Sequence, residues 1–91
     1  MINITLPSAA VVATSLVAEY RAREWSSVKI GNVSVSVSAR IGAAAGLAEV
    51  TVNWPGIGDK CAEDALAFAA ALAFAGNVAL HAERFLAEVA Q

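Results

Sequence analysis

Few residues of this chain have side chains that could carry out chemistry. His81 is its single histidine and Cys61 its single cysteine. A catalytic histidine needs a nucleophile or a carboxylate oriented toward it, and only Glu88, seven residues on, could share its helix face. Cys61 would lie about 30 Å from His81 along a straight helix. We therefore predict no catalytic or cofactor-binding residues, and we expect the protein not to be an enzyme.

Carboxylates gather where the last predicted helix begins. They lack the oxygen-rich loop pattern of calcium sites, so we predict no metal site. Carboxylates stabilise the positive end of a helix, and they could also contact a basic partner. Tryptophan is enriched at protein interfaces, which adds Trp25 to the candidates. The predicted partner-binding residues are Asp59, Glu63, Asp64, Trp25, Glu83 and Glu88.

The overall composition favours binding over catalysis. Hydrophobic residues make up 58% of the 91 residues and charged residues 15%, against about 45–50% and about 25% in soluble domains. Few charges are thus available to cover the surface, and association is the simplest way to bury what remains. The net charge of −2 disfavours nucleic acids and anionic membranes, which attract basic proteins. We expect a homo-oligomer without a cofactor.

Helical spacing is present at both ends of the chain. Pro7 and Ser8 form a helix start, with Ser8 as the N-cap. The apolar face of this first helix is predicted to consist of Ala9, Val12, Ala13, Leu16, Val17 and Tyr20. The second helix is predicted to start at Asp59, as N-cap, and to run to about Val89. Gly76-Asn77 would interrupt it, either as a kink or as a C-cap followed by a new N-cap.

The segment between the helices alternates with period two, which indicates strands. Apolar and polar residues alternate over residues 33–41 and again over residues 48–54. Residues 28–30 alternate on the opposite parity. Gly31-Asn32 is therefore either a hairpin turn or a bulge in one long strand, and we favour the hairpin. Residues 2–6 are expected as a short strand or an extended lead-in.

The two faces of these strands have different expected roles. Ser34, Ser36, Ser38 and Arg40 form one polar face, which we interpret as an exposed sheet surface, or alternatively as a docking surface or pairing edge. Trp54 follows the parity of the apolar face, so we predict that it packs in the core.

Together these elements predict a single α+β domain over residues 1–91. The order is α-β-β-β-α, with a small antiparallel sheet of about three strands covered on one face by two helices. The last helix is long, or broken at Gly76-Asn77. Its stretch ALAFAAALAFA, from Ala65 to Ala75, has no polar side chain. We expect this stretch to be a core helix with one side reserved for a partner chain. The predicted oligomer-interface residues are Phe68, Leu72, Phe74 and Phe85.

The element order and the stretch GIGDKCAEDALAFAAALA resemble double-stranded-RNA-binding domains. In that family, lysines at the entry to the last helix contact phosphates. Here Lys60 matches that pattern, whereas Asp59 and Glu63 are acidic where the family is basic. The resemblance implies the topology, but its charge pattern opposes the phosphate neutralisation that RNA binding needs. We therefore predict that nucleic acid is not a direct ligand.

Neither of the two apolar segments, residues 1–18 and 65–82, is expected to enter a membrane. Residues 1–18 lack a basic start, so no signal peptide is predicted. Residues 65–82 are barely long enough to span a bilayer and contain Gly76, Asn77 and His81. The single cysteine fits a reducing compartment. We therefore expect a cytoplasmic protein.

The predicted function is a non-enzymatic protein–protein interaction module, working as a homodimer. Small acidic α+β proteins without catalytic motifs are common among phage and mobile-element accessory proteins. The most specific hypothesis, by analogy with that group, is an inhibitor of the anti-CRISPR type that binds a host nucleoprotein complex. The alternatives are a double-stranded-RNA-binding-like domain and a structural oligomerisation subunit.

Overall fold

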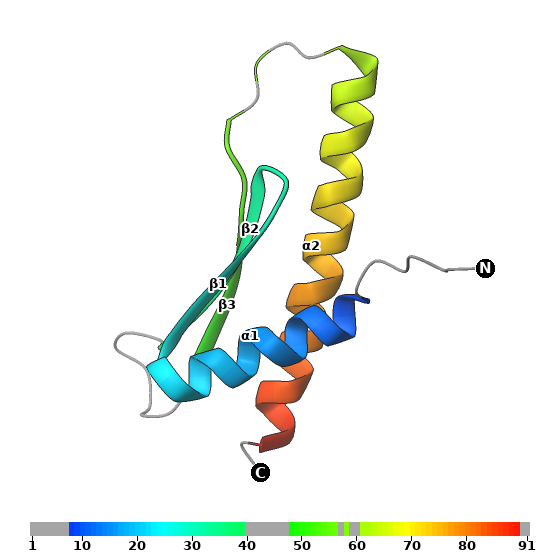
Figure 1. Ribbon diagram of the computed structural model, residues 1–91. Coiled ribbons are helices and arrows are strands. Elements are labelled where there is room, and N and C mark those ends of the chain that lie inside the picture. The colour runs from blue at the N-terminus through cyan, green and yellow to red at the C-terminus, as the bar shows by residue number, and fades with distance from the viewer. Residues whose placement is uncertain (1–7, 40–47, 57, 59–60, 90–91) are drawn as a thin grey trace, which may run out of the picture.

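The computed structural model of the protein describes residues 8–39, 48–56, 58 and 61–89 (Figure 1). Two helices flank three strands in the order α-β-β-β-α, which confirms the predicted α+β fold. The elements are α1 (Ala9–Arg23), β1 (Trp25–Ile30), β2 (Val33–Ala39), β3 (Ala48–Asn53) and α2 (Ala62–Val89).

Helix α1 begins and ends at residues with defined caps. The Ser8 side chain accepts a hydrogen bond from the Val11 amide at 3.2 Å, which satisfies one of the free amides at the helix start. The predicted N-cap is thereby confirmed. At the other end, Glu24 adopts a left-handed conformation with φ of 63°, and its amide donates to the Tyr20 carbonyl at 2.6 Å. This turn leads the chain directly into β1.

Strands β1 and β2 form the predicted hairpin. Ile30 lies opposite Val33, so Gly31 and Asn32 form a two-residue turn, and the bulge alternative is wrong. Gly31 has φ of 62°, and type II′ turns place glycine at this first central position. A Cβ atom on Gly31 would lie 3.6 Å from the Ala71 Cβ. The tip of the hairpin therefore reaches α2 at Ala71.

Strand β2 lies at the centre of the antiparallel sheet, in the order β1-β2-β3. Val35 pairs with Val28 of β1 on one side and with Val52 of β3 on the other. This register places apolar side chains of all three strands on the same face. Along β2, Val33, Val35 and Val37 are fully buried, whereas the serines between them are only half-buried.

Both helices pack on the apolar face of the sheet, and α1 crosses the C-terminal half of α2 (Figure 1). The buried helix residues are Ala13, Leu16 and Val17 of α1 and Ala75, Val78, Ala79 and Ala82 of α2. Among the described residues, Ser26 is the only buried polar one. Its hydroxyl donates to the Leu16 carbonyl at 2.7 Å, so it joins β1 to α1 within the core.

Helix α2 is continuous through Gly76 and Asn77, so of the two alternatives the long helix is confirmed and the break is excluded. Glycine in a helix interior costs about 1 kcal/mol relative to alanine. Here Ala75 and Val78, on either side of the pair, are fully buried. Packing of these neighbours against α1 and the sheet offsets the local preference for a break.

The predicted core position of Trp54 is wrong, and several predictions of other kinds fall on residues that the structure does not describe. Trp54 is 52% exposed, because β3 ends at Asn53 and the alternating parity no longer applies beyond it. The Ala65 amide donates to the Cys61 carbonyl at 3.0 Å, at the start of α2. The predictions for Asp59 as N-cap, Lys60, Arg40 and residues 2–6 lie outside the described part of the chain.

Candidate protein interface

Helix α2 is longer than the sheet it covers. The hairpin tip contacts it at Ala71, and residues 62–67 are all exposed. At 1.5 Å per residue, α2 begins about 13 Å before that contact. Leu66 lies in this protruding part and is 72% exposed. This end of α2 therefore presents a large apolar side chain without cover from the described residues.

The apolar surface continues along the side of α2 that faces away from the core. Leu80 is 61% exposed, and it follows Leu66 by fourteen residues, a little less than four turns. Residues at intermediate helical spacing lie on the same side, and all are exposed. We call this surface the outer stripe; it consists of Leu66, Ala69, Ala73, Asn77, Leu80 and Arg84.

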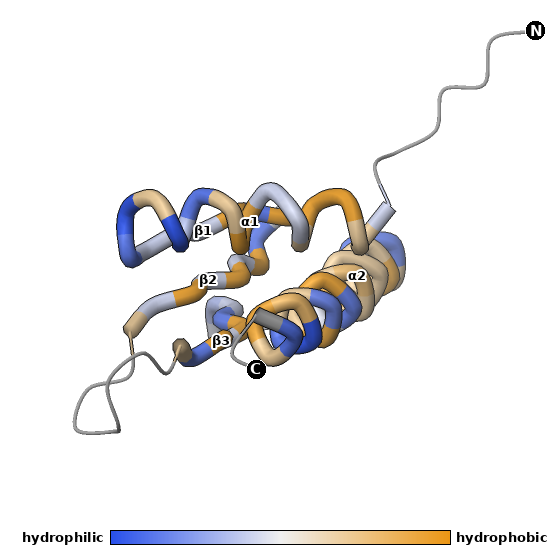
Figure 2. Tube along the Cα trace, turned by 90° about the horizontal axis from the view of Figure 1, so that it is seen from below, coloured by the Kyte–Doolittle hydropathy of each residue, from blue (hydrophilic) through white to orange (hydrophobic). Residues whose placement is uncertain are grey.

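Within the described residues, α2 is the one helix long and apolar enough to cross a membrane by length and composition, over Ala62–Glu88. Coloured by hydropathy, it is apolar along its middle and polar toward both ends (Figure 2). Only 22% of its most apolar window is buried. The buried part is the side against α1 and the sheet, so the apolar surplus lies on the outside.

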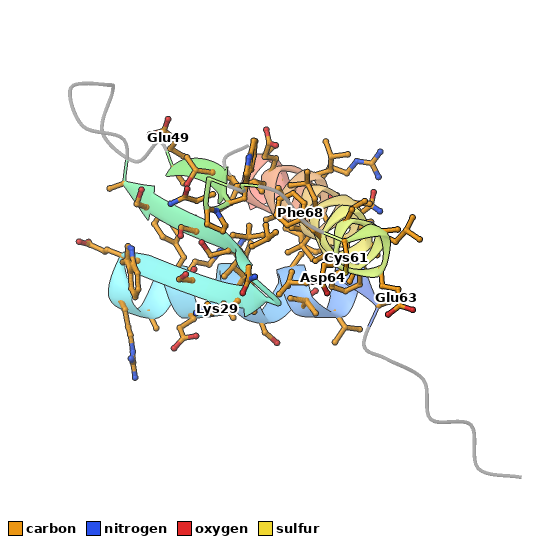
Figure 3. The ribbon with its side chains drawn as sticks, turned by 90° about the horizontal axis from the view of Figure 1, so that it is seen from above. Lys29, Glu49, Cys61, Glu63, Asp64 and Phe68 are labelled. Carbon is orange, nitrogen blue, oxygen red and sulfur yellow. The ribbon has the colours of Figure 1, made fainter. Side chains whose placement is uncertain are left out.

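The predicted oligomer-interface residues have contacts within the monomer. Phe68, Leu72, Phe74 and Phe85 are all half-buried against the core, and Phe68 lies on the side of α2 toward the strands (Figure 3). The Phe85 carbonyl accepts a hydrogen bond from the Arg21 guanidinium at 3.3 Å. These side chains help to hold α2 in place, and their role in an oligomer stays a prediction.

Sequence reasoning missed Leu66 and Leu80, the two most exposed large apolar residues of the described chain. The signal that could have found them is their spacing. Each lies seven residues from Ala73, whereas the buried Ala82 lies nine residues from it, about half a turn away. A helical projection centred on the core-facing alanines would therefore have placed both leucines opposite the core.

The predicted acidic residues are exposed wherever they are described. Glu63, Asp64, Glu83 and Glu88 are exposed on α2, and Glu63 points away from the sheet (Figure 3). Asp59 lies outside the described residues. In the part of the chain that the structure describes, the single ion pair joins Arg23 and Glu19 of α1 at 3.8 Å. These α2 carboxylates are therefore available for contacts to another molecule.

The other face of the sheet is polar apart from Trp25. Trp25 is 58% exposed and lies opposite Ser38 at one end of the hairpin. Lys29 lies near the other end of β1, and the Ser36 hydroxyl donates to the Ser27 hydroxyl at 3.4 Å. Trp25 is thus exposed, as its predicted interface role requires, but it is not part of the outer stripe.

The residues whose side chains could take part in chemistry do not lie close together. His81 stacks on Phe85, with ring centroids 6.1 Å apart and an interplanar angle of 26°. Cys61 is exposed at the opposite end of α2. Over the described ranges, no group of three or more histidine, cysteine, aspartate or glutamate side chains is placed to hold a metal ion.

Two shallow grooves flank α1. A groove of about 280 Å³ lies between α1 and β1 and includes Val11, Glu19 and Val28. A second groove, of about 200 Å³, lies between α1 and the end of α2, where Arg21 and Glu88 line it. Neither contains His81 or Cys61, so the described grooves do not bring a nucleophile and a base together.

Comparisons with protein-family models, with curated proteins and with solved structures found no match to this chain.

Proposed function

We propose that this protein is a non-catalytic protein–protein interaction module that works as a homodimer. The observation that carries the proposal is the apolar outer side of α2, with Leu66 72% and Leu80 61% exposed. Burial of one leucine side chain is worth about 1.5–3 kcal/mol. Association with a second protein surface would recover part of that energy, which the isolated chain leaves unused.

The arrangement of the polar residues supports binding over catalysis. His81 lies on α2 and Cys61 immediately precedes this helix, twenty residues away, which corresponds to about 30 Å. On the polar face of the sheet, the Ser36 hydroxyl contacts the Ser27 hydroxyl, and Ser34 and Ser38 are half-buried. A polar sheet face without a convergent site suits a scaffold that positions α2. We also propose that the protein is cytoplasmic.

The experiment that tests this proposal is sedimentation velocity over a concentration series from about 1 µM to about 200 µM. A homodimer predicts a sedimentation coefficient that rises with concentration toward the dimer value. A monomer at every concentration would contradict the proposal. Salt-sensitive binding to duplex RNA in the same preparation would instead favour the double-stranded-RNA-binding alternative.

A narrower candidate function, inhibition of a host nucleoprotein complex, is favoured by the exposed carboxylates of α2. Carboxylates can occupy basic channels that otherwise bind nucleic acid. Asp64→Lys and Glu88→Lys should then abolish co-purification with a CRISPR-type nuclease complex while leaving the protein folded. Unchanged co-purification of both variants would remove these carboxylates from the contact.

A further inference from the structure

The outer stripe of α2 is symmetric about Ala73. Leu66 lies seven residues before Ala73 and Leu80 seven residues after it. Seven residues turn a helix by about 700°, only about 20° short of two turns. Both leucines therefore point in nearly the same direction as Ala73, and all three are exposed. A helix with this pattern matches its own copy when the copy is reversed.

Resting on the homodimer proposed above, we infer that a second copy of this chain pairs with α2 in antiparallel orientation, with the twofold axis at Ala73. In this arrangement, Leu66 of each copy lies against Leu80 of the other. Ala69 and Asn77 meet across the contact, and the small side chains in the middle allow the helices to approach closely. The same surface is used by both copies, as a twofold dimer requires.

Charge complementarity selects the second copy as the occupant of this surface. Glu63 lies ten residues before Ala73, and Arg84 lies eleven residues after it. Antiparallel pairing brings them to the same level, about 1.5 Å apart along the axis, on the same side of the contact. Glu83 lies on the opposite side, beside Ala62 and the adjacent small residues of the second copy. Each dimer thus gains two opposite-charge pairs.

Glu63 and Arg84 have no ion-pair partner within the described residues. Parallel pairing would instead place the two Arg84 side chains at the same level near the centre of the contact, and the two Glu63 side chains on opposite sides of it, away from Arg84. Like charges at matched positions disfavour association. The charge pattern therefore selects the antiparallel orientation as well as the partner.

The size of the contact sets the expected affinity. From Ala62 to Arg84 the paired region is about 33 Å long, and a helix with its side chains is about 10 Å wide. This footprint is smaller than the area of about 800 Å² per partner that standard interfaces bury. We therefore expect a reversible dimer with a dissociation constant in the micromolar range, within reach of the concentration series above.

Cysteine cross-linking tests the position of the axis. Ala73→Cys in a Cys61→Ser background should form a disulfide-linked dimer under mild oxidation. Helix axes about 8–10 Å apart bring the two Ala73 Cα atoms to within about 4–5 Å, which a disulfide can bridge. The matched control is Ala87→Cys in the same background, another exposed alanine of α2. The two Ala87 positions would be about 42 Å apart along antiparallel helices, so we expect no cross-link.

The unsubstituted protein provides a test of orientation. Cys61 is exposed, and antiparallel pairing would separate the two Cys61 residues by about 36 Å. Oxidation of the wild-type chain should therefore leave it uncross-linked. A disulfide dimer through Cys61, or equal cross-linking at positions 73 and 87, would overturn the antiparallel arrangement.

A charge exchange tests the predicted Leu66–Leu80 contact. Leu66→Lys and Leu80→Glu should each weaken dimerisation at least tenfold, because each variant buries a charge against leucine. The double variant places Lys against Glu at both ends of the antiparallel dimer, so its affinity should recover several-fold over the single variants. Parallel pairing would place Lys against Lys and give no recovery.

The matched control is Val11→Lys, an exposed apolar residue of α1 (57% exposed) outside the outer stripe, which should leave the dimer unchanged. Circular dichroism should find all variants folded, since both leucines are exposed in the monomer. A dimer unaffected by either leucine variant would overturn this geometry while leaving the proposed homodimer intact. A monomeric wild-type chain that floats with neutral lipid vesicles, and loses that binding in Leu66→Lys, would overturn both and assign α2 to a membrane.

Discussion

At the scale of single residues, Ser26 joins the first helix to the sheet. Its hydroxyl donates to the Leu16 carbonyl at 2.7 Å, and its exposed fraction is 1%. The sequence places a polar residue on the apolar parity of β1, where an aliphatic side chain would ordinarily stand. The hydrogen bond to a helix carbonyl accounts for that exception, because a buried hydroxyl needs a partner.

Ser26→Ala should lower the free energy of unfolding by about 1 kcal/mol, the typical net value of one buried hydrogen bond. Urea unfolding followed by circular dichroism measures this change. Ser36→Ala is the matched control, because the Ser36 hydroxyl makes only a 3.4 Å contact on the exposed face, and its effect should be close to zero. Equal effects of the two substitutions would contradict the assigned role of Ser26.

Glu24 is a non-glycine residue in a left-handed backbone conformation. It adopts φ of 63° at the end of α1, a conformation that glycine reaches without steric cost. Glu24→Gly should therefore raise the free energy of unfolding by up to about 1 kcal/mol. The same substitution at Glu19, inside α1, should lower it by about 1 kcal/mol. A loss of stability at both positions would show that the left-handed turn is not strained.

At the scale of elements, hydrophobic periodicity predicted the strands and α1 well. The parity change around Gly31-Asn32 predicted a hairpin, which the pairing of Ile30 with Val33 confirms. At Gly76-Asn77 the pattern left a long or a broken helix open, and the structure has the long one; tertiary packing of Val78 outweighs a local preference that is worth only about 1 kcal/mol. The exposure of Trp54 could not be predicted, because parity does not say where a strand ends.

The candidate interface could be read only in part from the sequence, because helical spacing gives the outer side of α2 but not the point where the sheet stops covering it. Leu66 belongs to the same apolar stretch as Phe68, and composition does not distinguish them. Leu66 and Phe68 are two residues apart, about 200° around the helix, so Phe68 packs against the core and Leu66 faces away from it. How far α2 extends beyond the hairpin tip at Ala71 depends on strand length and register. The prediction named three phenylalanines and Leu72, which are half-buried against the core, whereas the exposed leucines of α2 are Leu66 and Leu80.

Gly76 gives a prediction at this scale. A Cβ atom there would meet nothing within 4 Å, so Gly76→Ala should raise the free energy of unfolding by about 1 kcal/mol through helix propensity. The change is best measured in the Leu66→Lys background, where self-association contributes little. Gly31→Ala is the opposite control and should be destabilising, because Gly31 has φ of 62°. A destabilising Gly76→Ala would indicate that a backbone distortion at this position is needed.

At the scale of the whole molecule, the two apolar sides of α2 differ in burial. The inner side, with fully buried residues such as Ala75 and Val78, holds the monomer together. The outer stripe has no cover from the described residues. Substitutions on the inner side should therefore change the free energy of unfolding of the monomer. Substitutions on the outer stripe should instead change the dissociation constant of the proposed dimer.

Phe68→Asp and Phe74→Asp should lower the stability of the monomer by about 2–4 kcal/mol, because each ring packs against the core. Both variants should also be less soluble, since partial unfolding exposes the apolar face of the sheet. Leu66→Asp should instead leave the unfolding midpoint of the dilute monomer nearly unchanged and weaken the dimer. Denaturant unfolding at low concentration, paired with sedimentation at high concentration, separates the two effects. If both phenylalanine variants remained soluble with unchanged stability and oligomeric state, neither ring could be buried against the sheet, and α2 would have to be held by other contacts.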